Sequence, residues 1–216
     1  ILSATVVGLV AAGSLSAQSE PTIHEFLASN SEGIVDFEGD HSDWIELHNP
    51  TNSTKSLNGW YLTDDETDLT KWELPNISLS PDEFVVVFAS GKNLTNPSNE
   101  LHTNFNLNKD GEYLALVKSN GTTIAYEYAP TYPQQYTDLS YGINPNGDLR
   151  YFTGPSPGYT HAGLGWEGVV SDIQFSTERG VVSGSTTVQI TTDPPDANIR
   201  FRTDGSEPTT TSGHLY

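Results

Sequence analysis

The stretch EYLALVKSNGTTIAYEY, residues 112–128, decides the class of fold. Polar and apolar residues alternate on both sides of Asn120-Gly121, and aromatic or β-branched residues recur in both arms. Asn-Gly is the strongest short signal for a hairpin, because a type I′ turn needs a positive φ at both of its central positions. The stretch therefore predicts two antiparallel strands, 112–118 and 122–128, joined by a tight turn.

Further runs of the same character lie upstream, each bounded by Gly, Asn, Asp or Pro. No window shows a sustained 3.6-residue periodicity with helix caps. The run 83–89 (EFVVVFA) is apolar on both faces, so we expect a central strand that is covered on both sides. Together the runs predict an all-β protein built on an antiparallel β-sandwich. The upstream runs are residues 22–28, 43–48, 57–63, 69–74 and 83–89.

The chain changes character after residue 150. Residues 151–168 are rich in Gly and Pro and show no strand pattern, so we place a linker at 161–168. A second β segment, 169–216, follows and ends with a run that leads into Asp204-Gly205, another hairpin dipeptide. Because about three strands are marginal on their own, we expect this second small β-sandwich module to be incomplete. Its expected strands are 172–176, 186–192 and 198–203.

The N-terminal residues 1–17 read as an export signal. They are apolar to about Gly13, and Ser14-Leu15-Ser16, with Ala17 adjacent, has the small-x-small pattern of a signal-peptidase site. The alternative is a buried core strand or helix. A start without Met predicts a chain truncated at this end, and the incomplete second module predicts truncation at the other. We expect a secreted or cell-surface protein that does not insert in the membrane once the signal is removed.

Composition excludes several classes of function. The 216 residues carry 9 basic and 28 acidic side chains, for a formal charge of −19 and a pI near 4.3. Such a field repels phosphate backbones, so we expect no nucleic-acid partner. The chain has no cysteine, which excludes disulfides, thiol nucleophiles and thiolate metal sites.

The motif Gly154-Pro155-Ser156-Pro157-Gly158 matches the G-x-S-x-G pattern of a serine hydrolase nucleophile. That elbow needs the backbone N–H of the residue after the serine as an oxyanion donor, and Pro157 has none. Prolines on both sides of Ser156 also favour extended backbone over a helix. We therefore interpret the motif as a turn and predict no catalytic residue in this chain.

Acidic stretches at 36–43 and 63–68 fall between predicted strands, where cation or partner contacts are expected. Asp36, Glu38, Asp40 and Asp43 offer oxygen ligands at alternating positions, which is chemistry suited to calcium, although the EF-hand pattern is not met. Calcium is the one cofactor we consider. The six histidines form no H-x-x-x-H or HExxH motif, which leaves open only a zinc site assembled across loops.

Four tryptophans could form a sugar-stacking face. Trp44, Trp60 and Trp72 lie in predicted strands and are expected in the core. Trp166 lies between Gly165 and Glu167 in the predicted linker and is the candidate ligand-binding residue, exposed or packed at the domain junction.

Residues 20–160 resemble the lamin-tail domain, an immunoglobulin-like β-sandwich. The closing turn Pro155-Ser156-Pro157-Gly158 lies where that family places a similar turn, with His161 in place of the usual Asn. The segment DWIELHN in combination with NLNKDGEYLAL is quite specific. The resemblance is carried by IHEFLASN, DWIELHNPTN, LNGWYLTDD, KWELP, LSPDEFVVVFASGK, NFNLNKDGEYLALVKSNG, LSYGINPNG and PSPGYTH.

Residues 169–216 resemble the accessory β module appended to chitobiases and β-hexosaminidases. The segment IRFRTDGSEPT, 199–209, fits that module's signature with Phe201 in place of a tyrosine. The module is not the catalytic barrel of those enzymes, so the resemblance implies no glycosidase activity.

Together these features predict a non-catalytic binding or structural module of a large exported multidomain bacterial protein. Its expected partners are extracellular or cell-surface proteins or polysaccharides. The alternative is the targeting region of an extracellular enzyme, with a catalytic domain beyond Tyr216: a kinase like spore-coat protein H, a nuclease, a phosphatase or a glycan-active hydrolase. A carbohydrate-binding module built on Trp166 is a further alternative.

Overall fold

A computed structural model describes residues 19–170, 173–178, 180–181, 183–192, 197–209 and 211–216. The predicted export signal, 1–17, lies outside the described residues. The chain divides into two compact units, one that ends at Gly165 and one that runs from Trp166 to Tyr216. No helix occurs among the described residues, and none of their segments could cross a membrane as a helix.

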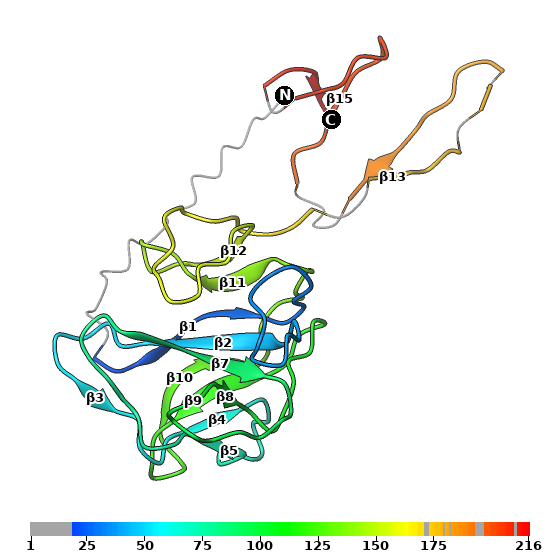
Figure 1. The fold of residues 1–216 in the computed structure, drawn as a ribbon. Coiled ribbons are helices and arrows are strands. Elements are labelled where there is room, and N and C mark those ends of the chain that lie inside the picture. The colour runs from blue at the N-terminus through cyan, green and yellow to red at the C-terminus, as the bar shows by residue number, and fades with distance from the viewer. Residues whose placement is uncertain (1–18, 171–172, 179, 182, 193–196, 210) are drawn as a thin grey trace. The chain divides into compact units, whose positions relative to one another are not determined.

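The first unit is a sandwich of two main sheets (Figure 1). One sheet has six strands in the order β12-β11-β1-β2-β7-β8, and every pairing in it is antiparallel except that of β7 with β8. Its strands are β1 (Thr22–Leu27), β2 (Asp43–His48), β7 (Phe84–Ala89), β8 (Leu101–His102), β11 (Ser140–Ile143) and β12 (Leu149–Phe152).

The second sheet has four strands in the order β10-β9-β4-β5, and β3 pairs with β6 in a separate two-stranded ribbon. This arrangement confirms the predicted antiparallel, immunoglobulin-like β-sandwich. The strands are β3 (Lys55–Ser56), β4 (Tyr61–Thr63), β5 (Trp72–Glu73), β6 (Ser78–Leu79), β9 (Leu114–Val117) and β10 (Ile124–Tyr128).

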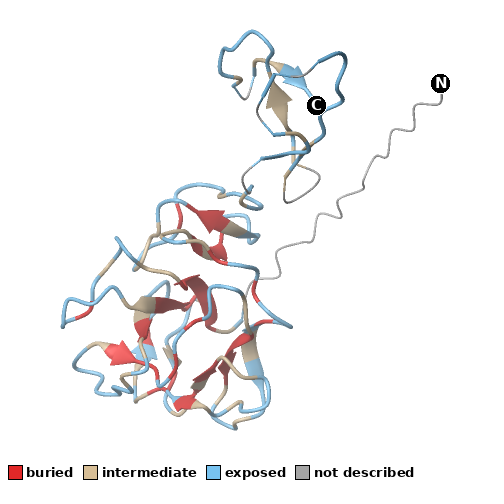
Figure 2. Cartoon of the chain, turned by 90° about the vertical axis from the view of Figure 1, so that its right-hand side faces the viewer, coloured by how far each residue is buried: buried red, intermediate tan, exposed pale blue. Residues whose placement is uncertain are grey.

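Alternation along each strand builds the core between the sheets. In β2, Ile45 and Leu47 are fully buried in the same cluster as Leu62, Leu114 and other residues of the second sheet. Because side chains of a strand alternate between faces, Trp44, Glu46 and His48 lie on the opposite face, away from this core. That opposite face, here called the outer face, is also buried: Figure 2 shows buried residues along most strands of the first unit.

The predicted hairpin at 112–128 is confirmed, but its turn type is not. Strands β9 and β10 pair antiparallel, and Gly121 has a φ of 70°, whereas Asn120 does not have a positive φ. The connection is a longer loop in which the Asn120 side-chain oxygen accepts hydrogen bonds from the backbone N–H groups of Thr122 and Thr123. The Asn120 side chain thus stabilises a loop that differs from a type I′ turn.

The prediction that 83–89 forms a central strand was wrong in part. Strand β7 is next to the edge of its sheet, with only the two-residue β8 beyond it. Both faces of the strand are nevertheless covered: Val87 packs in the sandwich core, while Phe88 joins a small outer cluster with Leu27 and Trp44. The strand is apolar on both sides because loops cover its outer face.

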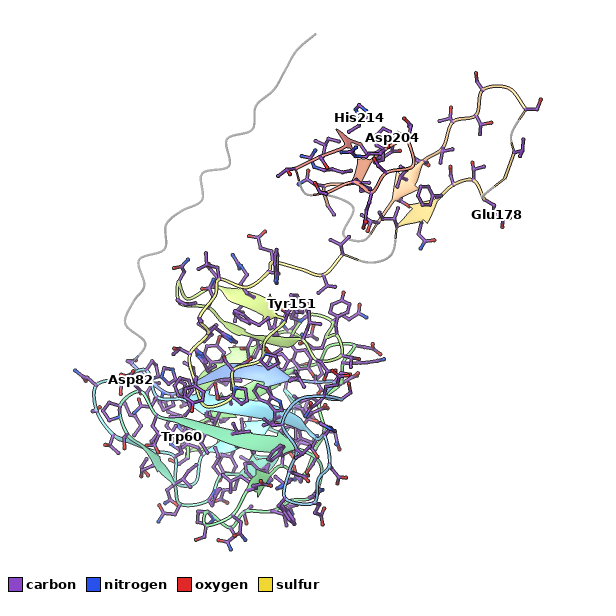
Figure 3. All side chains as sticks on the ribbon, turned by 45° about the horizontal axis from the view of Figure 1, so that its top comes forward. Trp60, Asp82, Tyr151, Glu178, Asp204 and His214 are labelled. Carbon is purple, nitrogen blue, oxygen red and sulfur yellow. The ribbon has the colours of Figure 1, made fainter. Side chains whose placement is uncertain are left out.

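The second unit consists of two short antiparallel ribbons, β13 (Gln174–Phe175) with β14 (Ile190–Thr191) and β15 (Arg200–Phe201) with β16 (His214–Leu215). It is consistent with a second small β module. Its strands are exposed or half-buried (Figure 2). Asp204 and His214 border a small hollow of about 310 Å³ in this unit, and both are labelled in Figure 3.

Candidate functional site

Two glutamates occupy the middle of the outer face. Glu25 of β1 and Glu46 of β2 are direct cross-strand partners, and both are 0% exposed. Alternation with Ile45 and Leu47 places Glu46 on this face. An irregularity in the pairing between Ile23 and Glu25 brings Glu25 beside it. Buried carboxyl groups need hydrogen-bond donors. The donors to Glu25 and Glu46 therefore show which segment of the chain packs on this face.

The donors come from the turn at 155–158. The Ser156 backbone N–H lies 3.2 Å from both carboxylate oxygens of Glu25, and the Ser156 hydroxyl lies 3.1 Å from Glu25 Oε2. The backbone N–H of Gly158 donates to Glu46 Oε2. The turn is therefore fixed on the sheet by two carboxyl groups more than a hundred residues earlier in the chain. We call residues 153–161 the cover segment.

Burial controls the titration of both glutamates. It raises the pKa of Glu25 to about 7, although the hydrogen bonds from Ser156 offset part of the effect. It raises the pKa of Glu46 to about 8, and the neighbouring charge of Glu25 contributes to this shift. Near neutral pH the pair therefore holds at least one proton, which avoids two adjacent negative charges at fully buried positions.

Three histidines extend this buried polar face. The His24 ring lies 5.1 Å from that of His48 and 5.8 Å from that of His161, measured between ring centroids. His48 stacks on Phe84 and His161 on Phe152. Burial lowers the pKa of His24 to about 3 and that of His161 to about 4, so both rings are neutral at physiological pH.

The histidines do not converge on a metal-binding position. The Nε2 atom of each ring lacks a hydrogen-bond partner among the described residues. Across the same part of the chain, no three histidine, aspartate or glutamate side chains are arranged to hold a metal ion. The rings serve here as flat, neutral packing surfaces against Phe84 and Phe152.

Ser156, His161 and Glu25 have the composition of a catalytic triad. The Ser156 hydroxyl lies 3.0 Å from His161 Nδ1, and His161 Nε2 lies 3.6 Å from Glu25 Oε2. However, Glu25 also bonds the Ser156 hydroxyl and backbone N–H directly, so the carboxylate holds the serine in place as well as facing the imidazole. His161 is 4% exposed and stacked under Phe152, and Pro157 offers no oxyanion donor. The arrangement fits a structural hydrogen-bond network.

The structure brings together three of the four calcium candidates. Asp36 Oδ2, Glu38 Oε2 and Asp40 Oδ2 lie 2.6, 2.7 and 2.9 Å from the ammonium nitrogen of Lys92. Asp43 lies apart from them and accepts a hydrogen bond from the Asn30 backbone N–H at 3.3 Å. Lys92 thus occupies the position between the carboxylates at which a cation would bind.

Lys92 also explains how Asp36 is tolerated with no exposed side-chain surface. Burial alone would raise the pKa of Asp36, but hydrogen bonds from Lys92, from the backbone N–H groups of Asp40 and Glu38 and from Ser42 lower it to about 2. The pKa of Lys92 is raised in turn by its bonds to Asp36 and Glu38. Sequence reasoning missed Lys92, because it follows β7, 56 residues after Asp36.

In the other acidic stretch, 63–68, Asp64 pairs with Lys71 at 2.6 Å, and Asp65 accepts hydrogen bonds from Thr67. Trp44, Trp60 and Trp72 are buried in the first unit, as predicted. Trp166, the candidate ligand residue, is 64% exposed.

Comparison with protein families gives two matches. The model described as Lamin Tail Domain matches residues 15–130, and the model described as Chitobiase/beta-hexosaminidase C-terminal domain matches residues 177–216. No curated protein matches the chain at a significant level. The first match spans more than half of the sequence and includes the strands that carry Glu25, Glu46 and the Asp36 loop. The chain therefore belongs to the lamin tail domain family, and a chitobiase/β-hexosaminidase C-terminal-like module follows that domain.

Proposed function

We propose that the chain is a non-catalytic binding or structural module of an exported multidomain protein of bacterial type. Both matched families are β modules of accessory type, which supports this proposal. The observation that carries it is the sealed outer face. Glu25 is 0% and His161 is 4% exposed, and Ser156, which is half-buried, has its hydroxyl and its backbone N–H hydrogen-bonded to Glu25.

A sandwich of this kind acts through its loops, which a rigid core presents to partners. The loop of Asp36 and the loop that carries Lys92 are joined by ion pairs and lie at the ends of β2 and β7. We expect contacts with an extracellular protein or polysaccharide there.

A fluorophosphonate probe tests the non-catalytic part of the proposal. The full chain should show no more labelling than Ser156→Ala, because the Ser156 hydroxyl is held by Glu25 and no oxyanion donor follows it. Heat-unfolded protein supplies the background. Labelling of the folded wild type that disappears in S156A would overturn the proposal and make the chain a hydrolase.

Export is proposed from the apolar N-terminal stretch, and its test is direct. Expressed in a bacterium behind a short basic leader, which supplies the n-region that a signal peptide needs, the protein should be recovered from the medium or the cell surface. Its first residue should be Ala17 or Gln18. Recovery of an uncleaved chain inside the cell would contradict export.

The alternative function is the accessory region of an extracellular enzyme whose catalytic domain lies beyond Tyr216. The second family match favours this alternative, because modules of that kind are named for glycosidases. Sequencing the source DNA past both ends decides between the two. A catalytic domain downstream supports the accessory role, whereas further β modules and a surface-sorting segment support a scaffold.

A further inference from the structure

A hollow of about 790 Å³ opens between two loops of the first unit. One loop connects β7 with β8 and contributes Leu94, Asn96, Asn99 and Glu100, and the other contributes Phe37. A volume of this size is typical of ligand-binding clefts. We call this hollow the acidic pocket. It lies outside the Glu25–Glu46 network and has no part in it.

The walls of the acidic pocket are held in place by backbone contacts. Leu94 and His102 exchange two backbone hydrogen bonds of 2.9 Å, which attach the β7–β8 loop to the edge of the sheet. The backbone N–H of Phe37 donates to Glu100 Oε2 at 2.7 Å and so joins the two loops. Phe37 is nevertheless 63% exposed, and Leu94 is 37% exposed. Phe37 and Leu94 thus give the hollow its apolar surface.

The charge around this ring is negative. Asp36, Glu38 and Asp40 share the single ammonium of Lys92, which lies 5.7 Å from the centroid of the Phe37 ring. Among the described residues, no lysine or arginine lies within 4 Å of Glu100. The pocket therefore combines apolar surface with a carboxylate that has no permanent cation beside it.

His102 lies behind Glu100 and does not line the pocket. The ring is 0% exposed, and its Nδ1 is hydrogen-bonded to the Ser90 hydroxyl at 2.8 Å. Its Nε2 has no hydrogen-bond partner among the described residues and lies 3.7 Å from Glu100 Oε2. Burial lowers the pKa of His102, so the ring does not neutralise Glu100. The neutral ring therefore gives Glu100 no cationic partner on this side.

We propose that the acidic pocket binds the side chain of an arginine or lysine from a partner polypeptide. The head group pairs with Glu100, and the methylene stem packs on Phe37 and Leu94. This rests on the proposed binding role and names the partner's chemistry. The chain supplies its own precedent, because the ammonium of Lys92 lies near the same aromatic ring among carboxylates.

The alternative occupant, an amino sugar, fits the pocket less well. Sugar rings stack on a broad flat aromatic face, and Phe37 is the single aromatic residue among those that line the pocket. A long aliphatic stem with a cationic end matches both the apolar lining and the charge. The overall charge of −19 attracts a basic polypeptide from a distance as well.

The test compares N-acetyl-arginine methylamide with its neutral isostere N-acetyl-citrulline methylamide. Both are titrated into the ¹⁵N-labelled full chain and followed by amide chemical shifts. The arginine probe should shift the amides of Phe37 and residues 94–100. It should bind up to about fivefold more tightly than citrulline, as expected for one partly exposed ion pair. Glu100→Gln should abolish the preference, and Phe37→Ala should weaken both probes.

Glu73→Gln is the matched control, because Glu73 is an exposed carboxylate on β5 in the other sheet. It should keep the arginine preference. Equal binding of both probes, a preference that survives in E100Q, or shifts confined to other loops would each overturn the proposal. Shifts of the same amides by glucosamine but not by the arginine probe would assign the pocket to an amino sugar. Fluorophosphonate labelling and export do not depend on this pocket, so the two proposals can fail separately.

Discussion

Glu25 and Glu46 face each other across strands β1 and β2, fully buried, and each accepts a backbone N–H from the turn at 155–158. Two adjacent carboxyl groups without solvent cannot both ionise without cost. The pair is therefore stable in a protonated form, and ionisation of the second group acts against the packing of the cover segment.

The pair predicts that stability falls as pH rises above 4.5 and that the fall continues to about pH 8. The folded pKa values, about 7 for Glu25 and about 8 for Glu46, lie above the ordinary value of 4.5, so the folded state binds protons more tightly than the unfolded one. That contribution is complete below pH 4.5 and is lost as pH rises through 7 and 8. Between pH 6.5 and 8.5 the loss should be on the order of 2 kcal/mol, measured by urea unfolding.

The pH range 6.5–8.5 separates the effect of the glutamates on stability from that of the histidines. His24, His48 and His161 have lowered pKa values because of burial, so their contribution has the opposite sign and is lost as pH falls below 6.5. Glu46→Gln should flatten the decline above pH 6.5, and Glu73→Gln should leave it unchanged. An equal decline in wild type and E46Q would show that the pair does not control it.

The cover segment predicts a difference between two nearby glycines. Gly158 has a φ of 90°, whereas Gly154 does not have a positive φ, and a methyl group at either would meet nothing within 4 Å. Gly158→Ala should therefore destabilise by about 1–2 kcal/mol through backbone strain alone. Gly154→Ala should be nearly neutral. Thermal melting of the two variants compares them directly, and equal melting temperatures would contradict a fixed turn at 155–158.

The strands that sequence predicts best are those with clear alternation. Strand β2 and the β9–β10 hairpin were identified because their apolar residues recur with period two. Strand β11 was missed because Gly142 interrupts its pattern. The structure shows why glycine is there: a Cβ on Gly142 would lie 2.4 Å from the His24 carbonyl oxygen and 2.9 Å from Glu25 Cα. Close backbone approach cannot be recognised from one strand alone.

The polar network could be predicted only in part. Alternation with Ile45 and Leu47 places Glu46 on the outer face, beside Trp44 and His48, and a charged group among such neighbours indicates a buried carboxyl. Its partners could not be predicted. Glu25 reaches the same position through an irregularity in strand pairing, and its donor Ser156 lies 131 residues away. Lys92 could not be predicted as the partner of Asp36 either, because the two residues lie 56 positions apart in the sequence.

Lys92 makes the calcium hypothesis testable with one substitution. Because its ammonium already lies between Asp36, Glu38 and Asp40, millimolar calcium should leave the melting temperature of the wild type unchanged. Lys92→Gln removes that charge and should lower the melting temperature, since it leaves the buried Asp36 carboxylate without its cation. Calcium should then restore part of the loss in K92Q, and magnesium should restore less.

A rise in the wild-type melting temperature with calcium would show that the ion displaces Lys92, and the four-carboxylate prediction would regain support. Asp43→Asn distinguishes a calcium site made of three carboxylates from one that also includes Asp43. It should not alter any calcium response if Asp43 stays with Asn30, as the structure has it. A response that depends on Asp43 would require the loop to rearrange around the ion.

Trp166 carries the carbohydrate hypothesis, since it is the most exposed tryptophan of the described residues, at 64%. That hypothesis predicts retention of the full chain on insoluble chitin or cellulose and a severalfold loss of retention in Trp166→Ala, because ring stacking contributes about 0.5–1.5 kcal/mol beyond buried area. Tyr159→Ala is the matched control: its ring is 74% exposed and belongs to the first unit. Equal retention of wild type and W166A means that Trp166 is not the platform. Loss in Y159A alone would move the sugar-binding surface to the cover segment.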